Sequence, residues 1–190
     1  MKMVEQAEMF AIDAHAGQKR KGSNRPYVLH PIQAMQIVRR LTDDEEVVAA
    51  AVLHDTLEDT GVTKAELEKV FGKRVADLVA GVSENKRAER PAGETWKERK
   101  QETIENLKDA SRDVKLICLG DKLSNIRMMA KEYVVIGDEL WERFNQKDKN
   151  LHCWYYSELY KILREEFGDI EEIRDYREQL EIAFDWKEEA

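Results

Sequence analysis

Residues 44–60, DEEVVAAAVLHDTLEDT, combine an unbroken apolar run with a cluster of ionisable side chains. The run from Val47 to Leu53 is apolar on every side of a helix, which is typical of a helix buried at the centre of a domain. We therefore expect the rest of the chain to pack around this helix.

Four ionisable residues follow the apolar run: His54, Asp55, Glu58 and Asp59. On a continuous helix that turns by roughly 100° per residue, they fall within a wedge of about 140°. At the end of a buried helix these groups would repel one another and lack solvation unless a cation lay among them. A divalent metal on the histidine and the first aspartate would leave the other two carboxylates for proton transfer. The alternative is a solvated helix end with two salt bridges.

The composition describes an ordinary globular protein. A chain of 190 residues is long enough for one domain with a hydrophobic core, and 42% hydrophobic residues exclude wholesale disorder. A net charge of −8 argues against a general nucleic-acid-binding surface, although local basic loops can still bind an anionic small molecule.

Targeting and redox signals are weak. No apolar run approaches the roughly 20 residues that span a bilayer, and Glu5 and Glu8 stand where a signal peptide would be apolar. The two cysteines, Cys118 and Cys153, show neither metal-site nor disulfide spacing. We therefore expect a cytoplasmic protein without a membrane partner.

Helical patterning continues along the chain, and no run of alternating strands is present. We expect helices at residues 4–16, 30–40, 44–60, 64–72, 73–83, 96–110, 114–130, 150–167 and 169–186, with a short one near 138–144. Residues 42–45 and 63–66 fit capping boxes. We predict one domain over residues 1–190, with a motif-bearing core at about 4–130 and a C-terminal helical extension at about 133–187.

Two segments near the N-terminus carry chemistry. The loop QKRKGSNRPY, residues 18–27, is basic within an acidic protein and suits phosphate capture, with a solvated loop as the alternative. His30 precedes Pro31 at a helix start and can point inward as a metal ligand. His15 lies in the last turn of the first helix, where we favour a structural role.

Asp121 lies in the second strongly apolar helix, one turn before Asn125 on the same face. The preceding Gly120 would let another backbone or a metal approach closely. Asp121 either faces the site on the central helix or pairs locally with Lys122 or Arg127.

Two other groups of residues allow two interpretations each. Lys86, Arg87 and Arg90 in the polar loop 84–95 either contact phosphate or lie on the surface. The aromatic residues 154–156 either stack on a base or pack in the core. Aromatic side chains of this segment also suit a homodimer interface.

Four strings occur in order: AHAGQKRKGSNRPYVLHPIQA (14–34), AAAVLHDTLEDTGVT (49–63), FGKRVADLVAGVSENK (71–86) and LGDKLSNIR (119–127). With them, residues 7–130 resemble the hydrolase half of the Rel/SpoT stringent-response enzymes. The chain is most similar to the stand-alone small alarmone hydrolases of the HD superfamily, and the resemblance is weaker over the last 60 residues.

The resemblance implies an all-α HD-domain bundle, with the C-terminal helices packed on it, and one manganese ion. The metal ligands that it implies are His30, His54, Asp55 and Asp121. The catalytic acids that orient or deprotonate the attacking water would be Glu58 and Asp59. The substrate contacts would be Arg20, Lys21, Asn125 and Arg127.

Such a ligand set of two imidazoles and two carboxylates suits manganese, with zinc or iron(II) as alternatives. A bound metal would lower the pKa of its water from 15.7 towards roughly 7. Family members cleave the 3′-pyrophosphate from guanosine tetra- or pentaphosphate, giving GDP or GTP and pyrophosphate. The loop after Lys21 departs from the family pattern, so an adenosine alarmone or the 2′-phosphate of NADPH is an alternative substrate. A non-catalytic alarmone-binding protein is a third hypothesis.

Overall fold

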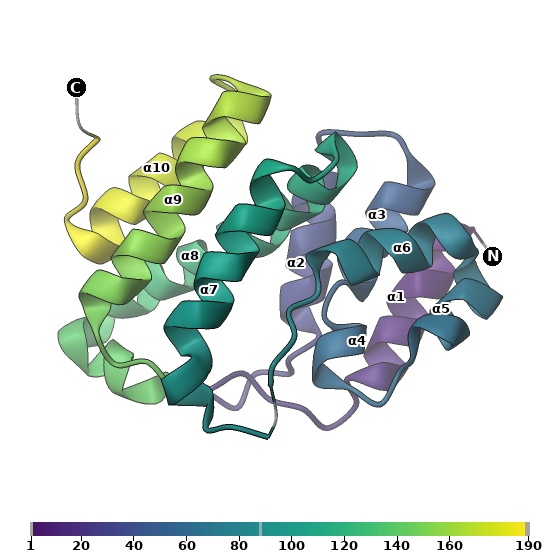
Figure 1. Ribbon diagram of the computed structural model, residues 1–190, viewed down its shortest axis with the longest axis horizontal. Coiled ribbons are helices and arrows are strands. Elements are labelled where there is room, and N and C mark those ends of the chain that lie inside the picture. The colour runs from purple at the N-terminus through teal and green to yellow at the C-terminus, as the bar shows by residue number, and fades with distance from the viewer. Residues whose placement is uncertain (1, 88, 189–190) are drawn as a thin grey trace. The chain divides into compact units, whose positions relative to one another are not determined.

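The computed structural model of the protein describes residues 2–87 and 89–188. Over these residues the chain is helical and contains no strand, apart from an isolated antiparallel bridge between Lys19 and Pro26. The predicted all-α fold is confirmed. The helices in Figure 1 are α1 (Met3–Ala14), α2 (Leu29–Val38), α3 (Glu45–Leu53), α4 (Thr56–Asp59), α5 (Lys64–Phe71), α6 (Lys73–Val82), α7 (Ala92–Lys108), α8 (Arg112–Ile136), the 3₁₀ helix η1 (Gly137–Arg143), α9 (Lys149–Phe167) and α10 (Glu171–Phe184).

The chain divides into two compact units. The first unit contains the residues up to Asn85 together with Ala110–Ser124, and the second contains Lys86–Asp109 together with the residues from Asn125 onward. Helix α8 therefore contributes residues to both. The single domain over residues 1–190 stays a prediction.

Helix α3 lies at the centre of the first unit, where it contacts α1, α2 and α6 (Figure 1). Every residue from Val47 to Leu53 is buried. Because neighbouring helices cover all sides of α3, its apolar run needs no polar face. The position predicted for this run is confirmed.

Capping decides where two helices of the first unit begin. Asp44 Oδ1 accepts hydrogen bonds from the backbone N–H groups of Glu46 at 3.0 Å and Val47 at 3.4 Å, so Asp44 caps α3. The capping box predicted at residues 42–45 is therefore wrong. The one predicted at residues 63–66 is confirmed, because Thr63 and Glu66 cap each other's backbone at the start of α5.

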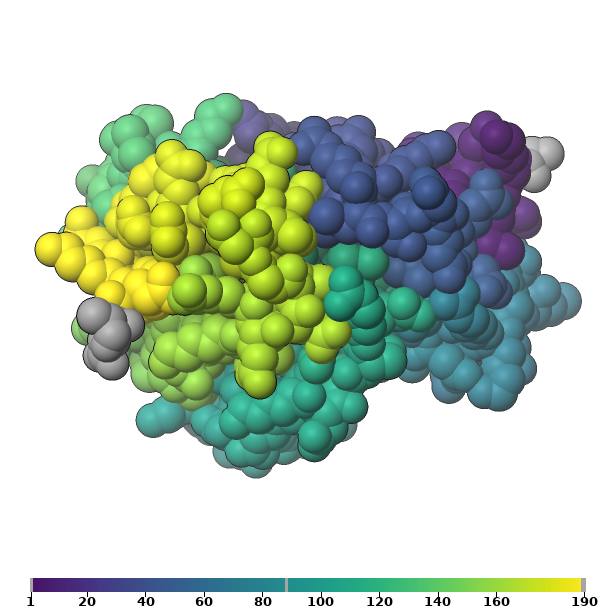
Figure 2. Space-filling view, turned by 90° about the horizontal axis from the view of Figure 1, so that it is seen from above, coloured from purple at the N-terminus to yellow at the C-terminus, as the bar shows by residue number. Residues whose placement is uncertain are grey.

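Helices α7, α9 and α10 belong to the second unit, in which α9 contacts both of the others. The adjoining yellow-green and yellow surfaces of α9 and α10 are visible in Figure 2. Tyr155 and Tyr156 are buried, and the ring of Tyr156 lies 6.4 Å from that of Tyr176 on α10. These two residues of α9 therefore pack in the core of the unit.

Outside residues 44–60, two helix boundaries differ from the prediction by more than two residues. Helix α7 begins at Ala92 instead of residue 96, because Pro91 occupies the N-cap and its carbonyl accepts hydrogen bonds from the N–H groups of Glu94 and Thr95. Helix α8 continues past residue 130 and ends at Ile136. The next residue, Gly137, has a φ of +59°, a conformation that favours glycine.

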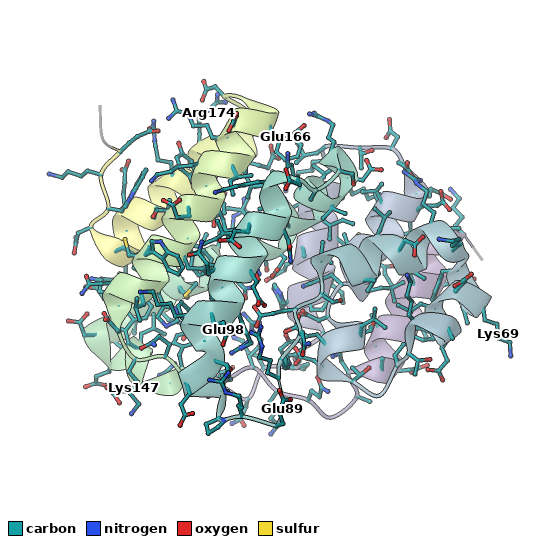
Figure 3. The ribbon with its side chains drawn as sticks, viewed as in Figure 1. Lys69, Glu89, Glu98, Lys147, Glu166 and Arg174 are labelled. Atoms are coloured by element: carbon teal, nitrogen blue, oxygen red, sulfur yellow. The ribbon has the colours of Figure 1, made fainter. Side chains whose placement is uncertain are left out.

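The surface is charged in both units. Lys69 on α5 and Lys147, which follows η1, extend away from the ribbon in Figure 3. Within the described residues, no helix is both long enough and apolar enough to cross a membrane.

Candidate metal centre

His30 lies in the first turn of α2, directly before Pro31. Proline suits this turn because its missing N–H would have no partner within the helix. The backbone N–H of His30 donates to the carbonyl of Tyr27 at 3.0 Å, which ties the helix start to the preceding loop. The side chains of His30 and His54 are each only 3% exposed, so their ring nitrogens need partners within the protein.

The chain does not run as one helix through His54 and Asp55. Helix α3 ends at Leu53, and the four-residue helix α4 begins at Thr56. Side chains compete with the helical hydrogen bonds here, because Thr56 Oγ1 donates to the carbonyl of Leu53 at 2.7 Å. The predicted continuous helix over residues 44–60 is therefore wrong at this point, and the wedge inferred from it does not describe the site.

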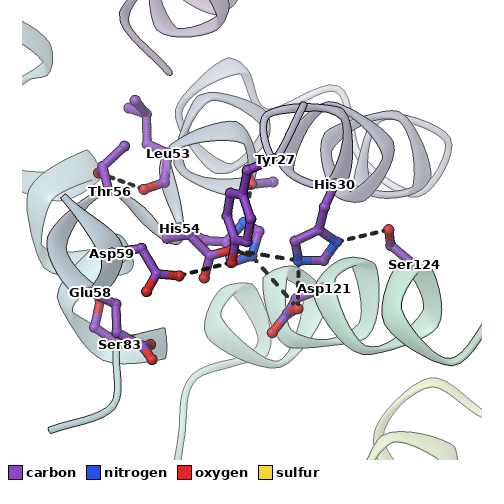
Figure 4. A network of polar contacts seen from close by, with 12 residues as sticks. Tyr27, His30, Leu53, His54, Thr56, Glu58, Asp59, Ser83, Asp121 and Ser124 are labelled. Atoms are coloured by element: carbon purple, nitrogen blue, oxygen red, sulfur yellow. Dashed lines mark hydrogen bonds and ion pairs between the residues drawn. The ribbon is translucent and has the colours of Figure 1, made fainter. Parts of the chain in front are cut away.

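The break brings four side chains from α2, the α3–α4 turn and α8 together (Figure 4). His30 Nε2 lies 3.1 Å from Asp121 Oδ1, and His54 Nε2 lies 3.1 Å from Asp55 Oδ2. The two cross distances, from His30 to Asp55 and from His54 to Asp121, are both 3.6 Å. One ligand atom each from His30, His54 and Asp121 lie within 4.8 Å of one another.

These distances fit a shared cation. Two ligand atoms that are each about 2.1 Å from one ion lie at most about 4.2 Å apart. The four distances between imidazole nitrogens and carboxylate oxygens are below this limit. A mixed nitrogen and oxygen donor set also suits a divalent first-row metal.

Hydrogen bonds on the opposite side of each ring fix which nitrogen faces the carboxylates. His54 Nδ1 lies 2.8 Å from the carbonyl oxygen of Ala51, which only accepts, so Nδ1 carries the hydrogen. His30 Nδ1 lies 2.9 Å from Ser124 Oγ, which donates its own hydrogen to Gln33 Oε1 at 3.3 Å and therefore accepts from the histidine.

In the neutral rings, both Nε2 atoms thus present a lone pair towards carboxylate oxygens. His54 Nε2 is a buried atom without a hydrogen-bond partner in the structure. A cation between the rings and the carboxylates would satisfy all of these groups.

The electrostatics of the site favour positive charge. Burial opposes a charge on His54, but the carboxylates of Asp55 and Asp121 outweigh it and raise the pKa of His54 well above its usual value. Burial lowers the pKa of His30 despite the same two carboxylates.

Both aspartates stay ionised in this setting. Burial favours the neutral acid, but the charge of His54 outweighs it and lowers the pKa of Asp55. For Asp121 the ammonium of Lys122 and the two histidines likewise outweigh burial and lower its pKa well below the usual range.

Asp121 has both kinds of neighbour that the sequence left open. Lys122 Nζ lies 2.6 Å from Asp121 Oδ2, while Oδ1 faces the two histidines. The two oxygens of one carboxylate thus serve the local pair and the candidate metal centre. Arg127, the other predicted local partner, instead donates from Nε to Asp175 Oδ2 at 2.7 Å.

Glu58 and Asp59 lie on α4, directly after the α3–α4 turn (Figure 4). Glu58 Oε2 accepts a hydrogen bond from the backbone N–H of Glu84 at 3.2 Å. Asp59 Oδ2 lies 2.8 Å from the hydroxyl of Tyr27. Both side chains are partly exposed, as acids that exchange protons with water need to be.

Tyr27 is a site residue for which the sequence analysis assigned no role. Its hydroxyl lies 2.8 Å from Asp55 Oδ2 as well as from Asp59 Oδ2. Burial and the two carboxylates raise the pKa of Tyr27, so the hydroxyl keeps its hydrogen. The signal in the sequence is its position three residues before His30. Ser124, one turn after Asp121, was missed in the same way.

The predicted phosphate loop, residues 18–27, ends at Tyr27. Its backbone closes on itself, because the N–H of Arg20 donates to the carbonyl of Arg25 at 3.0 Å. The guanidinium of Arg20 lies 5.5 Å from the centre of the Tyr27 ring, and Lys21 is exposed. Arg20 thus lies on the tyrosine that contacts Asp55 and Asp59.

Asn125 and Arg127, the other predicted substrate contacts, belong to the second unit. Arg127 is paired with Asp175 of α10. The substrate roles of all four residues stay predictions.

The profile of the HD domain family matches residues 7–140, more than half of the chain. The chain belongs to the HD domain family.

This HD domain is 40% identical, over 121 residues, to the guanosine-3′,5′-bis(diphosphate) 3′-pyrophosphohydrolase MESH1 of Danio rerio. It is 36% identical, over 135 residues, to the bifunctional (p)ppGpp synthase/hydrolase SpoT of Escherichia coli (strain K12). The alignments cover 62% and 68% of this chain, but only 64% and 18% of the two relatives. The chain thus spans less than two thirds of the length of either relative.

Two solved structures resemble the HD domain over most of its length. One, reported as a metazoan ortholog of SpoT that hydrolyzes ppGpp and plays a role in starvation responses, has a TM-score of 0.74 at 28% identity. That match covers 95% of this chain and 94% of the other. A protein of Listeria monocytogenes EGD-e has a TM-score of 0.71 at 31% identity, over 83% of this chain and 99% of the other.

Proposed function

We propose that the protein is a manganese-dependent hydrolase that removes the 3′-pyrophosphate of guanosine tetra- or pentaphosphate, giving GDP or GTP and pyrophosphate. The observation that carries the proposal is the convergence of His30, His54 and Asp121 beside Asp55, with two further acids on the next helix. The activities for which the similar proteins are named support the substrate class.

The protein's own residues supply most of what this reaction needs. The fixed tautomers of the two histidines direct Nε2 lone pairs at one point, and the two aspartates add negative charge there. A bound metal would polarise a phosphoryl oxygen and lower the pKa of its water. Manganese suits the nitrogen and oxygen donors, with zinc and iron(II) as alternatives.

Glu58 and Asp59 are the groups that would hold the proton of the attacking water. They follow the metal-binding turn within one turn of helix, which keeps them near the proposed ligands. General acid–base catalysis of this kind typically contributes about 10²- to 10⁴-fold to the rate. Two adjacent carboxylates share protons, so we assign the role to the pair.

Arg20 and Lys21 are the proposed phosphate contacts in the first unit, because both are cationic and follow the first helix in the basic loop. We propose the same substrate-side role for Asn125 and Arg127. The acidic net charge of −8 favours a small nucleotide over nucleic acid as the partner.

One assay tests the proposal and its substrate alternatives. The purified protein is incubated with manganese and either ppGpp, an adenosine alarmone or NADPH, and the products are separated by ion exchange. We expect pyrophosphate and GDP from ppGpp, and no product after chelation of the metal. Release of inorganic phosphate from NADPH with intact ppGpp would contradict the substrate, and binding of ppGpp without turnover would contradict the enzyme. Parallel reactions with zinc and iron(II) test the choice of metal.

A further inference from the structure

Tyr27 joins the two aspartates to which the proposed function gives different tasks. Its hydroxyl lies 2.8 Å from Oδ2 of Asp55, a proposed metal ligand, and 2.8 Å from Oδ2 of Asp59, a proposed catalytic acid (Figure 4). A phenol has one hydrogen and ionised carboxylates only accept, so the hydroxyl is a donor that both carboxylates can use.

The ring of Tyr27 is held from the side of α1. It lies 5.1 Å from the ring of His15, the C-cap of α1, which is only 2% exposed. His15 Nδ1 in turn lies 2.8 Å from Gln18 Oε1. These contacts fix the direction in which the tyrosine hydroxyl points.

The side chain of Gln18 contacts the backbone of Asp59. Its Nε2 donates to the backbone carbonyl of Asp59 at 2.8 Å, and its own carbonyl accepts from the N–H of Tyr27 at 2.9 Å. Residues 15–27 therefore hold Asp59 at both its side chain and its backbone.

Helix α4 needs such support. A helix of four residues forms few internal hydrogen bonds and is not stable by itself. Tertiary contacts must therefore determine where its acids point, and a misplacement of about 1 Å at a catalytic group can lower a rate roughly 100-fold.

We propose that Tyr27 is a positioning residue that, supported by Gln18 and His15, holds the Asp59 carboxylate in place beside Asp55. The inference rests on the proposed function, in which Asp59 handles the proton of the attacking water. It gives residues 14–18 (AHAGQ) and 25–27 (RPY) of the string at 14–34 a positioning role. This role is separate from the proposed phosphate contacts of Arg20 and Lys21.

The test is Tyr27→Phe, which removes the hydroxyl and keeps the ring that packs on His15. We expect kcat to fall about 10- to 100-fold with little change in KM, since the hydroxyl is proposed to act on Asp59 and not on the substrate. The matched control is Tyr176→Phe, which removes a buried hydroxyl bonded to the carbonyl of Tyr156 at 3.2 Å in the second unit. Its kcat should stay at the wild-type value.

A double-mutant cycle separates positioning from general loss of stability. In the Asp59→Asn background, Tyr27→Phe should lower kcat no further, because the group through which it acts is already removed. If Tyr27→Phe lowered kcat by the same factor in the wild-type and the Asp59→Asn backgrounds, the proposal would be contradicted. The proposal would also be contradicted if excess manganese restored the kcat of Tyr27→Phe to the wild-type value, since the hydroxyl would then act through Asp55 and the metal. Gln18→Met, which loses the donor to the Asp59 backbone, should show the same non-additivity and serves if Tyr27→Phe does not fold.

A structural measurement tests the inference without any activity. Crystal structures of the wild type and Tyr27→Phe should differ in the position of the Asp59 carboxylate, and an unmoved carboxylate would overturn the positioning role. If the wild type leaves ppGpp intact, the proposed function fails, but this comparison still tests Tyr27.

Discussion

A methyl group added to Gly120 would lie 2.7 Å from the backbone carbonyl oxygen of Ala34. Real Cβ atoms do not come so close to a backbone oxygen, and the Cγ2 atom of Val38 would be equally near. Helix α8 therefore approaches α2 at the residue directly before Asp121, on the helix that carries His30. The absent side chain of one glycine sets the spacing between two proposed metal ligands.

Gly120→Ala should separate α2 from α8. Overpacking of this kind costs about 1–3 kcal/mol, so we expect that loss in the free energy of unfolding, together with weaker metal binding. Chemical denaturation and metal titration measure the two effects. Gly81→Ala is the control, because its methyl group would meet only side-chain atoms of Val114, the nearest at 3.0 Å. Metal affinity equal to the wild type in Gly120→Ala would refute the spacing argument.

Asp55→Ala should abolish metal binding under conditions in which the wild type holds one ion. Removing a ligand should cost more than the roughly 10- to 100-fold that loss of a supporting hydrogen bond costs. Elemental analysis after dialysis gives the stoichiometry. Asp113→Ala removes an exposed aspartate that pairs with Arg74, and it should leave the metal content unchanged. Undiminished metal in Asp55→Ala would exclude this carboxylate from the ligand set.

Glu58→Gln and Asp59→Asn should separate catalysis from metal binding. Each keeps the shape of the side chain and removes its charge, so kcat should fall by about 10²- to 10⁴-fold while the metal content stays that of the wild type. Steady-state kinetics at saturating manganese measure the change. Loss of the metal in either variant would mean that the residue is a ligand and not a proton carrier.

Metal affinity should rise about tenfold per pH unit near neutrality, which corresponds to one displaced proton. The raised pKa of His54 makes it the group that must lose a proton. The pKa of His30 is lowered, so its ring is already neutral, and those of Asp55 and Asp121 are lowered, so both are already ionised. Above the pKa of His54 the affinity should level off. Calorimetry in buffers of different ionisation enthalpy counts the protons, and two per metal would contradict this assignment.

The helical fold was predictable because its signals are local. The apolar run of α3 is continuous in the sequence, and the reciprocally capping Thr63 and Glu66 are three residues apart. Both signals can therefore be recognised from neighbouring residues. The break after Leu53 was not predicted, since nothing in the helical period indicates that the Thr56 hydroxyl would take the carbonyl of Leu53.

The candidate site was predictable as a set of residues but not as a geometry. Spacing alone left Asp121 between a local pair and the central site, and the structure gives one oxygen to each. Tyr27 had no periodic or charge signal that distinguished it from a core aromatic. Its role depends on where α4 lies relative to residues 15–27, which is a tertiary relationship.

His152 should make the second unit less stable in acid. Its ring lies among Trp96, Trp141 and Phe144, with ring centres between 5.1 and 5.3 Å away, and its Nε2 lies 2.8 Å from the carbonyl oxygen of Gln146. Burial, and to a smaller extent the charge of Lys100, lower its pKa, although Asp148 and the carbonyl of Gln146 act in the opposite direction.

An unfolded histidine titrates near 6.5, so below that pH the unfolded chain binds a proton that the folded ring does not. Stability should therefore be complete above about pH 6.5 and decline as the pH falls towards the lowered pKa. His152→Phe keeps an aromatic ring and removes the titration. Its thermal midpoint should fall less than that of the wild type between about pH 7 and pH 5.5, and parallel declines would show that another group is responsible.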